Sequence, residues 1–133
     1  MAKYRIMIPG RFASLNEFIE ANRTHKQKGN KMKQQDQHDI SMYIMQQLHR
    51  VRIEKPIRIR YRFYEPNKKR DLDNISGYFH KVFQDSLVNC GVIVNDNWHY
   101  IVGFSDEFFV DSKYPRIEVE IQEVGGNNGE GRS

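Results

Sequence analysis

Hydrophobic and polar residues alternate along several short stretches of this chain, a pattern typical of β-strands with one buried and one solvated face. The first stretch covers residues 3–8 and stops at the turn Pro9-Gly10. A second covers residues 57–64, in which apolar and aromatic residues alternate with three arginines. The same pattern predicts a short apolar strand at 92–94 and further strands over 98–104, 108–110 and 116–124.

Apolar residues at helical spacing predict helices elsewhere in the chain. An early helix is short, because Ser14 and Glu17 have the spacing of a capping box and the apolar run ends near Asn22. A late helix covers residues 73–89, and Cys90-Gly91 supplies the C-terminal stop that such a helix requires.

A longer helix is predicted between these two, over residues 34–50, because Ile40, Ile44 and Leu48 recur every four residues. We expect a basic loop around Gly29-Asn30 to precede it. Strands and helices interleave without the regular spacing of βαβ units. The predicted fold class is therefore α+β, a small mixed β-sheet with helices packed on it.

The composition is that of one folded domain. The chain has 133 residues, of which 38% are hydrophobic, and its 8 Phe, 7 Tyr and 1 Trp are too many for a disordered protein. We expect a single domain over residues 1–124 and a disordered Gly/Asn-rich tail over 125–133. Cys90 has no partner for a disulfide, and no apolar stretch is long enough to cross a membrane, so we expect a cytoplasmic protein.

Charge is divided unequally between the two halves of the chain. Residues 1–70 carry 17 basic and 6 acidic residues, a net charge of +11, whereas residues 71–133 carry 4 and 11, a net charge of −7. A basic half is either ordinary solvated surface or a face that binds a polyanion such as DNA. The candidates for phosphate contacts are Lys26, Lys28, Lys31, Lys33, Arg58, Arg60, Arg62, Lys68, Lys69 and Arg70.

The candidate chemistry begins at Asp71 and Asp73, one residue apart at the start of the helix over 73–89. In extended chain, side chains at this spacing point to the same side, so the two carboxylates would converge on a hard cation such as Mg²⁺. The adjacent helix N-terminus favours phosphate oxygens. The alternative is that one of these residues only caps the helix.

Two further residues extend this candidate site. Asp96 lies in a turn where a chain reversal would return it to the same place, although an Asp in a turn is also ordinary. Three carboxylates and a metal ion suit phosphodiester hydrolysis. Lys81 lies two helical turns after Asp73, where it would reach a phosphate, or it is simply a surface lysine. The five histidines lack metal-site spacing and are expected on the surface.

These residues resemble the RusA family of Holliday junction endonucleases over about a fifth of the chain. The resemblance implies that Asp71, Asp73 and Asp96 bind the metal as catalytic acids, that Lys81 is the catalytic lysine, and that the protein is a homodimer that uses Mg²⁺ or Mn²⁺. It also implies a bacterial setting, phage or prophage encoded. The matching residues are Arg70-Asp71-Leu72-Asp73-Asn74, Lys81, Asp85, Leu87, Gly91 and Asn95-Asp96.

The sequence departs from the family pattern at two points. The family lysine follows the second Asp by four residues, whereas Lys81 follows Asp73 by eight and Gly77 occupies the four-residue position. Four extra residues are close to one helical turn, so the lysine would keep its face and move about 6 Å along the axis. Asn95 stands where an Asp often precedes the third acid, and we assign Asn95 and Asn74 supporting roles.

The resulting hypothesis is a metal-dependent endodeoxyribonuclease that resolves four-way DNA junctions by paired symmetric nicks, in DNA recombination and repair. Two identical sites in a twofold dimer match the symmetry of the junction. Two alternatives remain open: a basic DNA-binding module without catalysis, and a nuclease that uses the same site on flaps or single strands.

Overall fold

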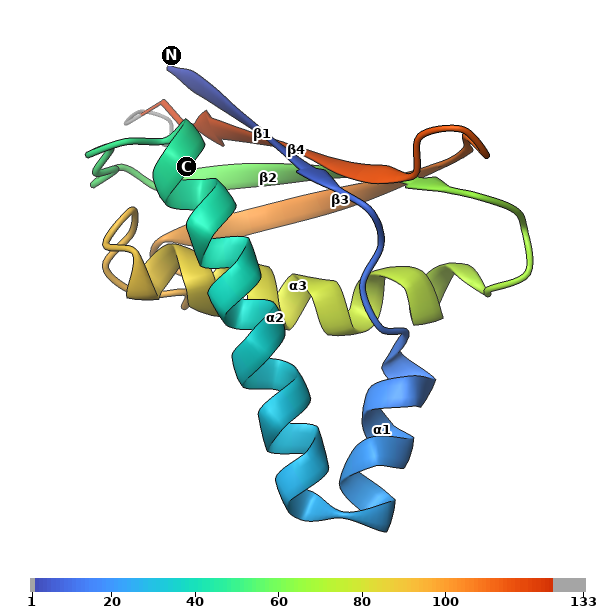
Figure 1. Cartoon of the computed structure of the whole chain (residues 1–133). Helices are drawn as coiled ribbons and strands as arrows, with labels where there is room; N and C mark the ends of the chain where they lie inside the picture. The colour runs from blue at the N-terminus through green and yellow to red at the C-terminus, as the bar shows by residue number, and fades with distance from the viewer. Residues whose placement is uncertain (1, 126–133) are drawn as a thin grey trace.

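The computed structural model describes residues 2–125, which form a four-stranded mixed sheet and three helices (Figure 1). The predicted α+β class is confirmed. In chain order the elements are β1 (Lys3–Pro9), α1 (Leu15–Thr24), α2 (Lys26–Gln47), β2 (Ile57–Glu65), α3 (Leu72–Asn89), β3 (Ile101–Val110) and β4 (Arg116–Glu123).

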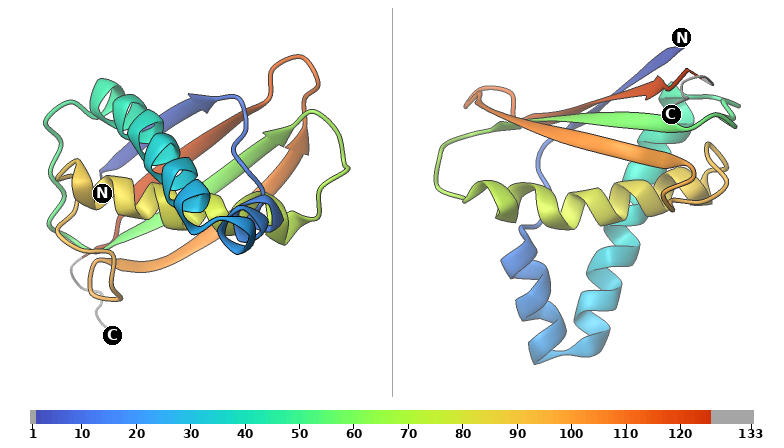
Figure 2. Two further views of the ribbon diagram at one scale, coloured as in Figure 1. Left: turned by 60° about the horizontal axis from the view of Figure 1, so that its bottom comes forward. Right: turned by 180° about the vertical axis from the view of Figure 1, so that it is seen from behind.

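The sheet has the order β1-β4-β2-β3, in which only the pairing of β2 with β3 is parallel. The connection between these two strands runs through α3, as parallel neighbours require. Helix α3 lies along one face of the sheet and α2 crosses it, whereas α1 and the first half of α2 form a hairpin that projects away from the sheet (Figures 1 and 2). Within residues 2–125, all three helices lie on one side of the sheet, and its opposite face has no helix on it (Figures 1 and 2).

The core lies between the sheet and α3. Alternation along β2 buries Tyr61 and Phe63 on the helix side, where they contact Phe79 and Phe83 of α3. The ring centroids of Tyr61 and Phe79 lie 6.0 Å apart in an edge-to-face arrangement, a favourable geometry for aromatic pairs. The apolar stripe read from the sequence of residues 73–89 is therefore the face that α3 buries.

The prediction of a basic loop before the long helix is wrong. Helix α2 begins at Lys26, so the residues around Gly29-Asn30 are helical. This part of α2 lies in the projecting hairpin and packs on α1, with Gly29 buried against Asn22. Because most of its turns face solvent, no apolar period marks it as a helix.

Two other boundaries differ from the prediction. Residues 98–100 form a turn. The rest of the predicted strand at 98–104 and the predicted strand at 108–110 belong to one strand, β3. The backbone of β3 pairs with β2 across the polar residues that separate its aromatic ones. The segment 92–94 bends and is not a strand. The predicted tail at 125–133 lies, except for Gly125, outside the described residues.

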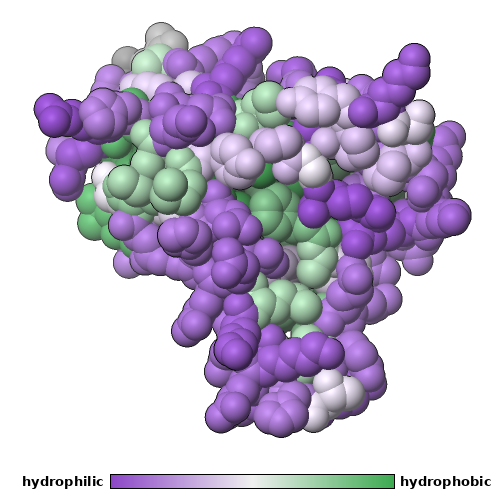
Figure 3. Space-filling model, in the orientation of Figure 1, coloured by the Kyte–Doolittle hydropathy of each residue, from purple (hydrophilic) through white to green (hydrophobic). Residues whose placement is uncertain are grey.

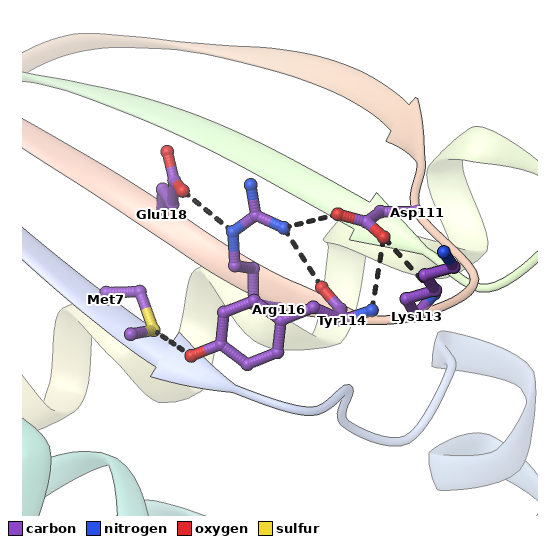
Figure 4. Close-up of polar contacts among 6 residues, drawn as sticks. All are labelled: Met7, Asp111, Lys113, Tyr114, Arg116 and Glu118. Atoms are coloured by element: carbon purple, nitrogen blue, oxygen red, sulfur yellow. Dashed lines mark hydrogen bonds and ion pairs between the residues drawn. The ribbon is translucent and has the colours of Figure 1, made fainter.

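The turn between β3 and β4 is organised by Asp111 (Figure 4). Its carboxylate accepts hydrogen bonds from the Tyr114 backbone N–H and the Arg116 guanidinium, at 3.1 and 2.9 Å. The bond from Arg116 is the main reason that the pKa of Asp111 lies below its usual value. Arg116 also bonds Glu118 and stacks 3.7 Å over the Tyr64 ring, so this corner of the open sheet face is well ordered.

No helix in residues 2–125 is long and apolar enough to cross a membrane.

The predicted capping box is confirmed, because the Ser14 hydroxyl accepts from the Glu17 N–H and the Glu17 carboxylate accepts from the Ser14 N–H. We expect Ser14→Ala to lower the free energy of unfolding by about 1 kcal/mol, measured by urea denaturation. The exposed Ser105 on β3 supplies the control, since Ser105→Ala removes no hydrogen bond within the described residues. Equal effects of the two substitutions would contradict the capping role.

Candidate functional site

Asp71 and Asp73 lie at the exposed N-terminus of α3. Asp71 occupies the N-cap position, and its backbone carbonyl accepts from the N–H groups of Asn74 and Ile75, but its carboxylate makes no capping hydrogen bond. Neither carboxylate has a side-chain partner among the described residues. Neither carboxylate therefore caps the helix through a side-chain hydrogen bond. Both acids are open to a ligand from solvent. They lie beside a helix N-terminus, which favours anions.

Arg70 fixes the start of α3 against α1. Its guanidinium donates to the Phe12 carbonyl at 2.8 Å and to the Glu17 carboxylate at 2.7 Å. Hydrogen bonding from the Ser14 backbone is the largest cause, and Arg70 a further cause, of a lowered pKa at Glu17. Arg70 is thus engaged within the protein, whereas the neighbouring Lys68 and Lys69 are exposed.

A second group of charges surrounds Lys81, further along α3. The Lys81 ammonium lies 3.2 Å from Asp85 Oδ1 and 3.7 Å from Asp96 Oδ2. Lys33 of α2 contacts the other oxygen of Asp85 at 3.3 Å. The turn that carries Asp96 thus brings it to Lys81, and Asp85 joins them through the i, i+4 spacing of the helix.

The contact with Asp85 favours the protonated form of Lys81. The hydrogen bond and the charge of Asp85 are the two largest causes of a raised Lys81 pKa, with a smaller contribution from Asp96. Lys81 is therefore a firmly protonated ammonium at neutral pH. In this state it can attract a phosphate or donate a proton, but it cannot act as a general base.

The two groups of acids lie at different places on α3. Eight residues separate Asp73 from Lys81, which is roughly 12 Å along the helix axis. Asp96 lies beside Lys81, and within residues 2–125 no three Asp, Glu, His or Cys side chains gather into a group that could hold a metal ion. The set of three metal-binding acids implied by the resemblance is therefore not assembled within a single chain.

The supporting asparagines lie one in each group. Asn74 is half-buried in the first turn of α3. Asn95 is exposed, and its side-chain oxygen accepts from the Asn97 N–H at 3.0 Å, so it shapes the turn that carries Asp96.

Sequence reasoning missed a half-buried pair between α3 and β3. His80 Nε2 lies 2.7 Å from Asp106 Oδ1, and the His80 ring packs against Tyr61 and Phe104. The expectation that every histidine lies on the surface is wrong for His80. No local signal marks this pair, because it depends on the parallel pairing of β2 with β3, which places Asp106 beside Tyr61.

The predicted DNA-contacting lysines of the hairpin are on its surface. Lys26, Lys28 and Lys31 are exposed and have no acidic partner among the described residues. Lys33 forms an ion pair with Asp85. The hairpin forms the lower lobe in Figure 3, which is predominantly hydrophilic. Its position away from the sheet gives these lysines access to an extended polyanion.

The arginines of β2 lie on the open face of the sheet among acids of neighbouring strands. Arg60 lies 3.7 Å from Glu120 of β4, and Arg62 bonds Glu107 of β3 at 3.1 Å. Arg58 has no acidic partner within the described residues. Because Arg60 and Arg62 share their charge with acids, this face is less basic than the sequence of β2 alone indicates.

Removal of the Asp85 charge tests its effect on Lys81. In Asp85→Asn the pKa of Lys81 should fall toward the ordinary lysine value, because the principal charged partner is lost. NMR titration of the lysine side-chain signals measures this change. Glu20→Gln on α1 is the control, and an unchanged Lys81 pKa in Asp85→Asn would show that the contact has no electrostatic effect.

One comparison with known proteins identifies the chain's relationship. The family model described as endodeoxyribonuclease RusA matches residues 13–122, which include all three helices, β2, β3 and both groups of acids. No individual curated protein matches the chain.

Proposed function

The chain belongs to the RusA family of endodeoxyribonucleases, and from this premise we propose that it resolves four-way DNA junctions by paired symmetric nicks that require a divalent cation. The observation that carries the proposal is the combination at α3: two unengaged carboxylates at its N-terminus and a protonated lysine on the same helix. We propose further that the protein acts as a homodimer in a bacterial, phage or prophage setting, because two identical sites match two symmetric cuts.

Divalent-metal dependence is general in this family. The oxygen ligands of Asp71 and Asp73 have the chemistry that Mg²⁺ and Mn²⁺ prefer, whereas Asp96 does not join them within one chain. We therefore propose the metal requirement from the family and the paired carboxylates, and we assign no catalytic step to the ion. Asp96 instead contributes where it lies, beside Lys81.

Lys81 would act on the phosphate as a cation. Its ammonium, oriented by Asp85, would stabilise the charge that develops on the phosphate and donate a proton to the leaving oxygen. Stabilising this charge needs a protonated lysine, and Asp85 shifts the Lys81 pKa in the direction that favours the protonated form. The exposed lysines of the hairpin, with Lys68, Lys69 and Arg58, would position the DNA arms without reading their sequence.

The first experiment compares a labelled four-way junction with a matched linear duplex, with Mg²⁺, with Mn²⁺ and with chelator. We expect symmetric, metal-dependent nicking of the junction only. Asp73→Asn should lower the cleavage rate by roughly 10²- to 10³-fold and leave junction binding intact, since the carboxylate serves chemistry. The exposed Glu54 supplies the control, Glu54→Gln, which should cleave normally.

Other outcomes would support the alternatives. Tight junction binding without cleavage under either metal would support the DNA-binding module, and equal cleavage of flaps or single strands would support the broader nuclease. Loss of junction binding in a folded Asp73→Asn protein would contradict the separation of binding from chemistry.

The hairpin lysines should determine the salt dependence of binding. Replacing Lys26, Lys28 and Lys31 with Gln should weaken junction binding and reduce the slope of log K against log salt by about 3, if each lysine neutralises one phosphate. Fluorescence anisotropy at several salt concentrations measures the slope. Lys113→Gln, in the turn between β3 and β4, is the control, and an unchanged slope in the triple variant would exclude the hairpin from the DNA interface.

A further inference from the structure

The side chain of Trp98 is 93% exposed, although it is the single tryptophan of the chain and its largest apolar ring. It lies in the turn between α3 and β3. The next two residues are also aromatic, but His99 and Tyr100 contact each other edge to face, with ring centroids 5.0 Å apart. Trp98 has no ring partner among the described residues. So large an apolar surface in water is unfavourable, and it points to a ligand.

The backbone that carries Trp98 is held by hydrogen bonds on both sides. The side-chain oxygen of Asn95 accepts from the Asn97 N–H, and that of Asn97 accepts from the His99 N–H, both at 3.0 Å. The Asn97 carbonyl accepts from the N–H groups of Tyr100 and Ile101, at 3.0 and 2.9 Å. The exposure of Trp98 is thus imposed by an ordered turn, whose backbone has little freedom to lose on binding.

Trp98 follows Asp96, a member of the charged group around Lys81, by two residues. Asp96, two residues earlier, lies 3.7 Å from the Lys81 ammonium. Two residues of extended chain span at most about 7 Å, so the Trp98 backbone lies within that distance of Asp96. A cation that attracts a phosphate and an aromatic face beside it are the two elements with which proteins hold a nucleotide that is not stacked in a duplex.

We propose that Trp98 stacks on an unpaired nucleobase next to the phosphate that Lys81 contacts, at the branch point of the DNA. This inference rests on the proposed function and adds the base-stacking residue to it. Stacking accepts any base, so Trp98 would favour branched or single-stranded DNA over duplex without adding a sequence preference. A second protein surface is the competing occupant, but the lysine and the phosphate chemistry of this site favour DNA.

The single tryptophan makes the test direct, because all tryptophan emission comes from Trp98. The protein is titrated with a four-way junction in the presence of chelator, which prevents cleavage. We expect the emission to be quenched and its accessibility to acrylamide to fall several-fold when the junction is saturated. Duplex DNA at the same occupancy should change the emission much less.

Variants supply the second readout. Trp98→Ala should weaken junction binding roughly 5- to 150-fold, whereas Trp98→Phe, which keeps an aromatic face, should recover most of the affinity. Val94→Ala is the matched control, because Val94 is also an exposed apolar residue, 58% exposed, in the same connection. Its binding should be unchanged. Circular dichroism confirms that each variant is folded.

The outcomes distinguish this inference from the proposed function. Unchanged emission at saturating junction, or wild-type affinity of Trp98→Ala, overturns the stacking role while cleavage by the wild-type protein keeps the resolvase proposal. Quenching that depends on protein concentration without DNA also overturns it, since a second protein copy then covers the ring. If the wild-type protein neither binds nor cleaves branched DNA, the proposed function fails and the stacking role fails with it.

Discussion

The packing of α3 against the sheet is the constraint on which the rest of the structure depends. Four aromatic side chains, Tyr61 and Phe63 of β2 and Phe79 and Phe83 of α3, interlock at the centre of the core. This contact sets the position of α3, and the charged groups of the candidate site lie on this helix or in its flanking segments, with Lys33 of α2 beside them. The geometry of the chemistry is therefore a consequence of aromatic burial, which supplies much of the stabilising free energy of a small domain.

The charge distribution in space differs from the distribution along the chain. The chain is basic in its first half and acidic in its second, yet β2 lies between β4 and β3 and brings basic and acidic residues side by side on the open sheet face. Within residues 2–125, the hairpin and the segment before α3 each keep neighbouring exposed lysines without an acidic partner. Since exposed ion pairs contribute little to stability, the pairing of Arg60 and Arg62 matters mainly because it lowers the positive potential of that face.

On one helix, the site combines a lysine paired with acids and two acids that have no partner among the described residues. Lys81 is tied to two acids, which keep it protonated, whereas Asp71 and Asp73 have no partner among the described residues. Arg70 explains how the unengaged acids stay in position, because its bonds to Phe12 and Glu17 hold the start of α3 while the carboxylates remain accessible. Unpaired carboxylates at a fixed helix end suit the recruitment of a cation and a phosphate.

Local physics along the chain is sufficient to predict the capping box at Ser14, the strand alternation of β2, the buried stripe of α3 and the α+β class. The relationship to the family is also carried by the sequence, because Arg70-Asp71-Leu72-Asp73-Asn74 and Asn95-Asp96 resemble the family and its model matches residues 13–122, although Lys81 stands four residues later than the family lysine. The capping box, the alternation of β2 and the stripe of α3 depend on neighbours within one turn of helix or along one strand, where propensity and periodicity act.

The helical start of α2, the continuity of β3 and most of the charged pairs depend on contacts between segments that are distant in sequence. The helical state of residues 26–33 depends on contact with α1, and the single strand β3 depends on pairing with β2, so neither has a signal in its own residues. Arg60, Arg62 and His80 have partners in elements distant in sequence, whereas Lys81 pairs with Asp85 on its own helix and with Asp96 in the turn after it. The separation of Asp96 from Asp73 likewise follows from the length and direction of α3, since aromatic packing fixes the helix and thereby fixes which charges meet.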